Sequence, residues 1–180
     1  MKKVFIDGGA HKGESIEVLL ENRQDMLGCD IHFFEPNQQL MSDLDSIKHS
    51  NDNYNIHIYN KALWVQDCSV LFLNSIGRWS TLAGTIIPEM NEIGGLKLDR
   101  DNPEAVGAVS LSNFLNEFDS EDYIILKLDV EGSEYYIIED LFLSGKIFMI
   151  DELYIEWHDH FFPGLIDTGS RLRSQLMNTN

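Results

Sequence analysis

The chain has 180 residues, 43% of them hydrophobic and 24% charged, which is enough to bury a real core, and we expect one domain over residues 1–180. The chain has 30 Asp and Glu residues and 13 Lys and Arg residues, so its formal net charge is -17. Such a surface repels phosphate backbones and anionic lipid, which excludes nucleic acid and membrane surfaces as partners.

The absence of targeting signals and the use of cysteine both bear on where the protein is located. No apolar run approaches the roughly 20 residues of a membrane-spanning helix, and Asp7 interrupts the first apolar stretch, so no signal peptide is visible. Cys29 and Cys68 lie far apart and form no CxxC pair, which indicates two reduced thiols. These features predict a cytoplasmic protein.

The first third of the chain alternates short apolar runs with amphipathic segments. One amphipathic segment, for example, has apolar residues at helical spacing, at Leu40, Leu44 and Ile47. The pattern predicts strands over residues 3–6, 31–34 and 55–60, and helices over residues 14–22 and 37–48.

The middle of the chain is less regular. Residues 62–65 and 69–73 flank a turn-like segment at 66–68, and this arrangement predicts a hairpin. The region 74–108 contains several glycines and no clean period, so we expect irregular structure with a short helix near 88–93.

The last third of the chain again alternates short apolar runs with amphipathic segments. Ser110 is expected to cap a helix over 111–118, and Gly145 to end a helix over 133–143. The remaining predicted elements are strands over 123–128 and 153–157 and a short helix from Gly169 onward.

Short apolar strands separated by helices predict an α/β fold, a mostly parallel sheet covered by helices on both faces. Right-handed crossovers place the carboxyl ends of the strands along one edge of the sheet. The polar residues that follow the strands, and so meet at this edge, are Asp7, Glu35, Asn60, Asp129 and His158.

The turn after the first strand, Gly8 to Gly13, is glycine-rich and opens a helix, which is how α/β sheets build nucleotide pockets. Its glycines lack the G-x-G-x-x-G spacing of a dinucleotide site, which disfavours the alternative of a nicotinamide oxidoreductase. Glu14 stands where a P-loop requires lysine. Asp7, just before the glycines, disfavours a pyrophosphate and favours a ligand with a cationic end.

S-Adenosylmethionine fits these constraints, because it carries an ammonium and a sulfonium and no phosphate. Glu35, at the end of the second strand, can accept hydrogen bonds from both hydroxyls of an adenosine ribose. Asp7, the glycine turn and Glu35 together therefore predict an S-adenosylmethionine pocket.

Five segments of the chain resemble the FkbM-type family of S-adenosylmethionine-dependent methyltransferases, in the family's order over residues 4–158. They are FIDGGAHKGES, FFEPN, NKALW, LKLDVEGSEYYIIEDL and IEWH. The resemblance implies a Rossmann-like class I methyltransferase fold and methylation of an oxygen, on a sugar, a glycan or a small natural product. By matching positions, the implied cofactor-binding residues are Asp7, Gly9, Ala10, Gly13, Glu35, Asn60 and Ala62, with Asp129 beside them.

Methyl transfer to a hydroxyl needs a group that accepts its proton. We predict Asp129, Glu131 and His158 as catalytic residues, with His158 favoured as the base because an ordinary histidine titrates near pH 6.5. Glu134 is a further acid on the same side. Carboxylates with a histidine also suit a divalent metal. The resemblance does not require one, and we assign no metal ligand.

One feature leaves an alternative function open. Class I methyltransferases usually add a strand hairpin after the fifth strand, and few residues follow His158, so we expect that hairpin to be lacking. A non-catalytic or partner-dependent subunit with a methyltransferase fold is therefore the alternative function. The acceptor is expected to contact residues 75–108 and 158–180, where Trp79 and Ser80 are candidate lining residues.

Overall fold

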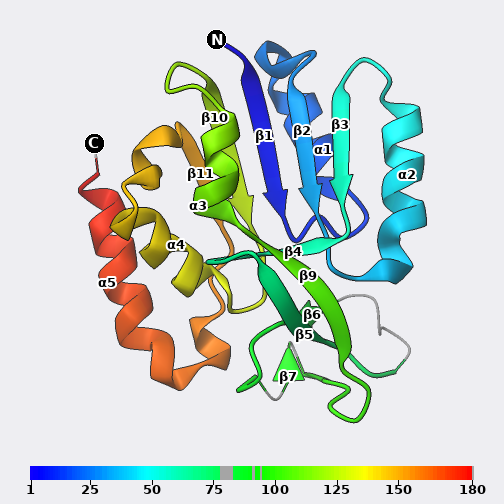
Figure 1. Cartoon of the computed structure of the whole chain (residues 1–180), viewed down its shortest axis with the longest axis vertical. Coiled ribbons are helices and arrows are strands. Elements are labelled where there is room, and N and C mark those ends of the chain that lie inside the picture. Colours follow the sequence, from blue (N-terminus) through cyan, green and yellow to red (C-terminus); the bar gives the residue numbers. More distant parts are fainter. Residues whose placement is uncertain (78–82, 91, 94, 180) are drawn as a thin grey trace.

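A parallel sheet of five strands forms the centre of the molecule, in the order β11-β10-β1-β2-β3 (Figure 1). The computed structural model describes residues 1–77, 83–90, 92–93 and 95–179. The strands are β1 (Lys3–Gly8), β2 (Asp30–Phe34), β3 (Asn55–Tyr59), β10 (Tyr123–Leu128) and β11 (Glu152–Ile155). All five predicted strands of the sheet are confirmed, and so is the α/β class.

Helices cover both faces of this sheet (Figure 1). Because side chains alternate along a strand, Phe5 packs on one face with Ile16 of α1 (Glu14–Asn22) and Leu44 of α2 (Met41–Ser50). Val4 packs on the other face, which α3 (Leu111–Phe114), α4 (Glu134–Leu143) and α5 (Ile166–Met177) cover.

Local signals set where several helices begin and end. The Asn37 side chain accepts a hydrogen bond from the Gln39 amide and opens a short 3-10 turn before α2. Ser110 caps α3 as predicted, and Gly145, with φ 72°, follows the end of α4. The 3-10 turns span Gln24–Met26, Gln38–Leu40, Leu115–Glu117, Lys146–Met149, Asp159–Phe161 and Pro163–Leu165.

The predicted hairpin over 62–73 is wrong. Strands β4 (Lys61–Trp64) and β5 (Cys68–Asn74) both form, but β9 (Glu104–Ser110) lies between them in a second sheet of order β4-β9-β5-β6. Asp67, in the intervening turn, accepts hydrogen bonds from the Ser110 amide at 3.2 Å and from the Asn113 side chain at 3.1 Å. The turn is thus tied to the start of α3 instead of closing a hairpin.

The expectation for residues 74–108 also needs correction. Besides β9, this region contributes β6 (Gly84–Thr85), β7 (Glu92–Ile93) and β8 (Leu96–Lys97), and the short helix expected near 88–93 is not found in its described residues. The Arg100 side chain donates to the carbonyls of Pro88 and Met90, which holds this stretch as a turn. Strands of two residues carry no periodic signal. Trp79 and Ser80 lie outside the described residues.

The last element of the described chain is the helix α5. Within the described residues no strand follows β11, and α5 packs beside α4 instead (Figure 1). No described helix is long and apolar enough to cross a membrane. Cys29 is buried and Cys68 half-buried, and both are free thiols.

A buried histidine lies on the face of the sheet that α3 covers. The His32 ring stacks on His57, with centroids 4.7 Å apart, and its Nδ1 lies 3.1 Å from the Tyr59 hydroxyl. Phe114 and Phe118 contact the ring edge-on. Its Nε2 has no hydrogen-bond partner among the described residues. Burial, helped by the charge of His57, lowers the pKa of His32 to about 4.

We expect this histidine to make the fold acid-sensitive. A folded-state pKa of about 4, below the ordinary 6.5, means that the unfolded chain binds the proton first. The stability contributed by neutral His32 is therefore fully present above pH 6.5 and is lost as the pH falls through 4, by on the order of 3 kcal/mol. Urea unfolding should show this loss of stability in the wild type but not in His32→Phe as the pH falls across this window.

The control is His49→Gln, which removes an exposed histidine of α2. Its unfolding free energy should follow that of the wild type at every pH. A His32→Phe variant that lost stability as steeply as the wild type between pH 6.5 and 4 would contradict the prediction.

Candidate functional site

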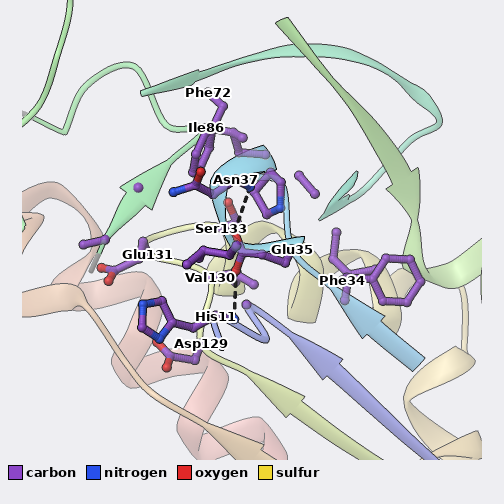
Figure 2. A pocket seen from close by; sticks show the side chains of 17 residues that line it. His11, Phe34, Glu35, Asn37, Phe72, Ile86, Asp129, Val130, Glu131 and Ser133 are labelled. Carbon is purple, nitrogen blue, oxygen red and sulfur yellow. Dashed lines mark hydrogen bonds between the residues drawn. The ribbon is translucent and has the colours of Figure 1, made fainter. Parts of the chain in front are cut away.

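An open cleft lies where the carboxyl ends of β1, β2 and β10 meet the second sheet. Figure 2 shows Glu35 and Asn37 inside this cleft, with Asp129 and Glu131 on one side of it and Phe34 on the other. The residues that line it include Gly9, His11, Glu35, Ala62, Phe72, Asp129, Val130, Glu131 and Ser133.

The glycine turn places β1 directly against the end of β10. The amides of Gly9 and Ala10 both donate to the Phe34 carbonyl, at 3.0 and 3.1 Å. Gly9 has φ 77°, and a Cβ there would lie 1.8 Å from the Asp129 carbonyl oxygen. Gly13, with φ 82°, then starts α1. The turn therefore needs glycine at position 9 for steric as well as conformational reasons.

We expect Gly9→Ala to destabilise the protein far more than Gly28→Ala. Both glycines have φ 77°, so each substitution places alanine in the left-handed region at a cost of about 1–2 kcal/mol. Only at Gly9 does the new methyl group also meet backbone, since nothing lies within 4 Å of a Cβ at Gly28. Equal losses of unfolding free energy in urea would show that the contact with Asp129 is unimportant.

Asp7 lies behind the turn and is fully buried. Its carboxylate pairs with Lys127 of β10, with Nζ at 3.0 Å from Oδ1, and accepts from the Ser15 hydroxyl of α1. Burial would lower the pKa of Lys127, but the charges of Asp7 and Asp129 outweigh it and keep the lysine charged. Asp7 is not among the residues that line the cleft, so its charge first serves to join β1, α1 and β10.

Glu35 is buried yet faces the cleft. Its Oε2 accepts from the His11 amide at 2.9 Å and its Oε1 from the Asn37 amide at 2.8 Å (Figure 2). Each oxygen has more than one acceptor site, so both can take a further donor from a ligand. Burial, only partly offset by these two amides, raises the pKa of Glu35 to about 7.

The structure separates two of the residues implied to bind the cofactor, Asn60 and Ala62. Ala62, in β4, lines the cleft. The Asn60 side chain instead donates to the carbonyls of Glu35 and Pro36, both at 3.0 Å, and does not line the cleft. Asn60 therefore fixes the backbone around Glu35.

The turn after β10 is strained. Glu131 has φ 49° and Gly132 φ 99°, and a Cβ at Gly132 would lie 2.5 Å from the Phe162 ring. The Thr85 hydroxyl, from the second sheet, donates to the Glu131 carbonyl at 2.7 Å. This turn points the Glu131 side chain toward the end of β11.

A buried pair, Glu134 and His158, joins this turn to the segment after β11. Glu134 Oε2 accepts from the Gly132 amide at 2.9 Å, and Oε1 accepts from the His158 amide at 3.0 Å. The same Oε1 lies 3.1 Å from His158 Nδ1. The imidazole is thereby held in one orientation.

The other ring nitrogen of His158 faces carboxylates. Nε2 lies 3.2 Å from Glu131 Oε2, 3.8 Å from Asp129 Oδ1 and 3.9 Å from Glu156 Oε1. Burial alone would lower the pKa of His158, but the bond to Glu134 and the surrounding charges raise it to about 9. Burial raises the pKa of Glu131 to about 7, against the opposing effect of His158. The three predicted catalytic residues are therefore in contact, although His158 is charged at neutral pH in this arrangement.

Sequence reasoning missed three residues of this site. Lys127 had a signal, a single lysine inside the apolar run of β10. Thr85 comes from a strand of two residues that carried no pattern. Glu156 follows β11 directly, and only the structure shows it facing His158.

Comparison with known protein families matches residues 7–174 to the methyltransferase FkbM domain. The matched span runs from the end of β1 into α5 and contains every residue of the cleft and of the His158 cluster. No curated protein and no solved structure matches the chain.

Proposed function

We propose that this chain, which belongs to the FkbM methyltransferase family, moves the methyl group of S-adenosylmethionine to a hydroxyl oxygen. The acceptor class we propose is a sugar, a glycan or a small natural product. The observation that carries the proposal is Glu35, a buried carboxylate that lines the cleft and whose two oxygens each accept one backbone amide, which leaves acceptor capacity for a ligand. We also propose a cytoplasmic location, in keeping with the two free thiols.

The donor half of the cleft suits an adenosine with a cationic tail. Glu35 would accept the two ribose hydroxyls, and the ligand would lie against Gly9, which lines the cleft. Asp129, whose side chain is 32% exposed, lies at the same edge and would accept from the ammonium group. Among the described residues, the lining includes no Lys or Arg, in keeping with a ligand without phosphate.

The acceptor would lie on the Glu131 side of the cleft. In the step, the acceptor oxygen bonds to the methyl carbon as the carbon–sulfur bond breaks, leaving S-adenosylhomocysteine. The hydroxyl proton must go to a base within hydrogen-bond reach. We assign this role to Glu131, which lines the cleft, and assign His158, which is buried behind it, to positioning.

Glu35→Gln should lower the affinity for S-adenosylmethionine about ten- to a hundredfold at pH 8. The substitution keeps the shape but replaces charge-assisted bonds of about 1.5–3 kcal/mol with weaker neutral ones. The wild-type affinity should also fall as the pH drops through about 7, because a protonated Glu35 no longer accepts both hydroxyls. Isothermal titration calorimetry across pH 6 to 8.5 measures both effects.

Glu17→Gln, an exposed acid on α1, serves as the charge-matched control and should bind like the wild type. Absence of any binding heat in the wild type, or an unchanged affinity in Glu35→Gln, would overturn the proposed donor site.

Turnover is tested by following S-adenosylhomocysteine formation with panels of sugar and natural-product hydroxyl acceptors. We expect Glu131→Gln to reduce kcat with little change in donor affinity, since Glu131 acts only on the acceptor side. Donor binding by the wild type without turnover of any hydroxyl acceptor would instead support a non-catalytic or partner-dependent binding subunit.

A further inference from the structure

We propose that Asp129, Glu156 and His158 form a binding site for a small divalent cation at the acceptor end of the cleft. The three residues follow the neighbouring strands β10 and β11, so the sheet itself brings them together. Each offers one donor atom, and these atoms all lie within 4.8 Å of one another.

The separations suit a shared cation. With metal–ligand bonds of about 2.1 Å, adjacent donors of an octahedral site are about 3.0 Å apart and opposite donors about 4.2 Å apart. His158 Nε2 lies 3.8 Å from Asp129 Oδ1 and 3.9 Å from Glu156 Oε1, between these two values. Small side-chain rotations would bring the atoms into place, because Glu156 is 65% exposed and Asp129 is 32% exposed.

Glu134 prepares the imidazole for such a role. A carboxylate only accepts hydrogen bonds, so the contact of Glu134 with Nδ1 places the ring proton there. In the neutral ring the lone pair then lies on Nε2, the atom that faces the cluster. A histidine held by a carboxylate on one nitrogen and presenting the other is the usual second-shell arrangement of a metal ligand.

The cluster also has more acceptors than donors. Three carboxylate oxygens approach Nε2, which can carry at most one proton. One of them, Glu131 Oε2, is enclosed and, apart from its ion pair with His158 Nε2 at 3.2 Å, has no hydrogen-bond partner among the described residues. Buried acceptors are normally satisfied, and a cation between these groups would satisfy this one.

The Lys127 ammonium does not occupy the position proposed for the cation. It contacts the other oxygen of Asp129, Oδ2, at 3.6 Å and is shared with Asp7. Oδ1 therefore remains directed at His158. One imidazole with several carboxylates is a mixed nitrogen and oxygen set of the kind that suits Mn²⁺ and similar ions. A cation here would lie beside the cleft-lining Glu131 and could bind an acceptor oxygen.

The site is tested by binding and does not depend on methyl transfer. The full chain is treated with a chelator, desalted and titrated with Mn²⁺ alone, with free Mn²⁺ followed by electron paramagnetic resonance. We expect saturable binding of one ion per chain, weakened about tenfold or more in Glu156→Gln, since even outer-shell changes typically cost that much. Asp129→Asn should show the same loss.

Glu121→Gln is the matched control, because it removes an exposed carboxylate before β10 and changes the net charge equally. It should bind Mn²⁺ like the wild type. Equal weakening in Glu121→Gln and Glu156→Gln, or no saturable binding in the wild type, would overturn the proposal. Titration of Glu156→Gln with S-adenosylhomocysteine, expected to match the wild type, keeps failure of the cation site separate from failure of the donor site.

Discussion

The ion pair between Asp7 and Lys127 is the interaction on which the rest of the site depends. It joins the carboxyl ends of two neighbouring strands, β1 and β10, at the point where Gly9 and the Asp129 carbonyl come into contact. A buried charge without its partner is strongly unfavourable, so each residue of the pair requires the other. Because Ser15 also bonds to Asp7, the start of α1 is fixed to the same point. The turn between them then has little freedom, which is what a binding surface made of backbone needs.

Two buried carboxylates, Glu35 and Glu134, are held by the same kind of hydrogen bonds but differ in what their remaining acceptor capacity contacts. Glu35 and Glu134 are each held by two backbone amides, which fixes their position without using a positive side chain. Glu35 keeps its remaining acceptor capacity for the cleft. Glu134 uses it on His158 and is fully enclosed. The first is therefore suited to bind a ligand, and the second to orient a neighbour.

The sequence was sufficient for the elements that bury a periodic apolar face. The strands of the central sheet follow from runs such as Tyr123–Leu128, and Glu35 and Asp129 could be placed at one edge because parallel strands end together. The second sheet could not be predicted in the same way. Its strand β9 separates β4 from β5, a pairing across a long sequence distance that no local pattern encodes.

The role of His158 shows a different limit. An ordinary histidine at a sheet edge is a reasonable base, and that inference used only its unperturbed pKa. Its environment is set by Glu131, Asp129 and Glu156, which the fold brings within 4 Å of Nε2, and by Glu134 on the opposite nitrogen. Together they favour the charged ring, so in this state it cannot take up a proton from an acceptor. The excess of negative charge that produces this effect is the same excess that a bound cation would relieve. If the proposed function and the proposed cation site both hold, the chemistry beside Glu131 would depend on which positive charge occupies the cluster, the ring proton or a metal ion.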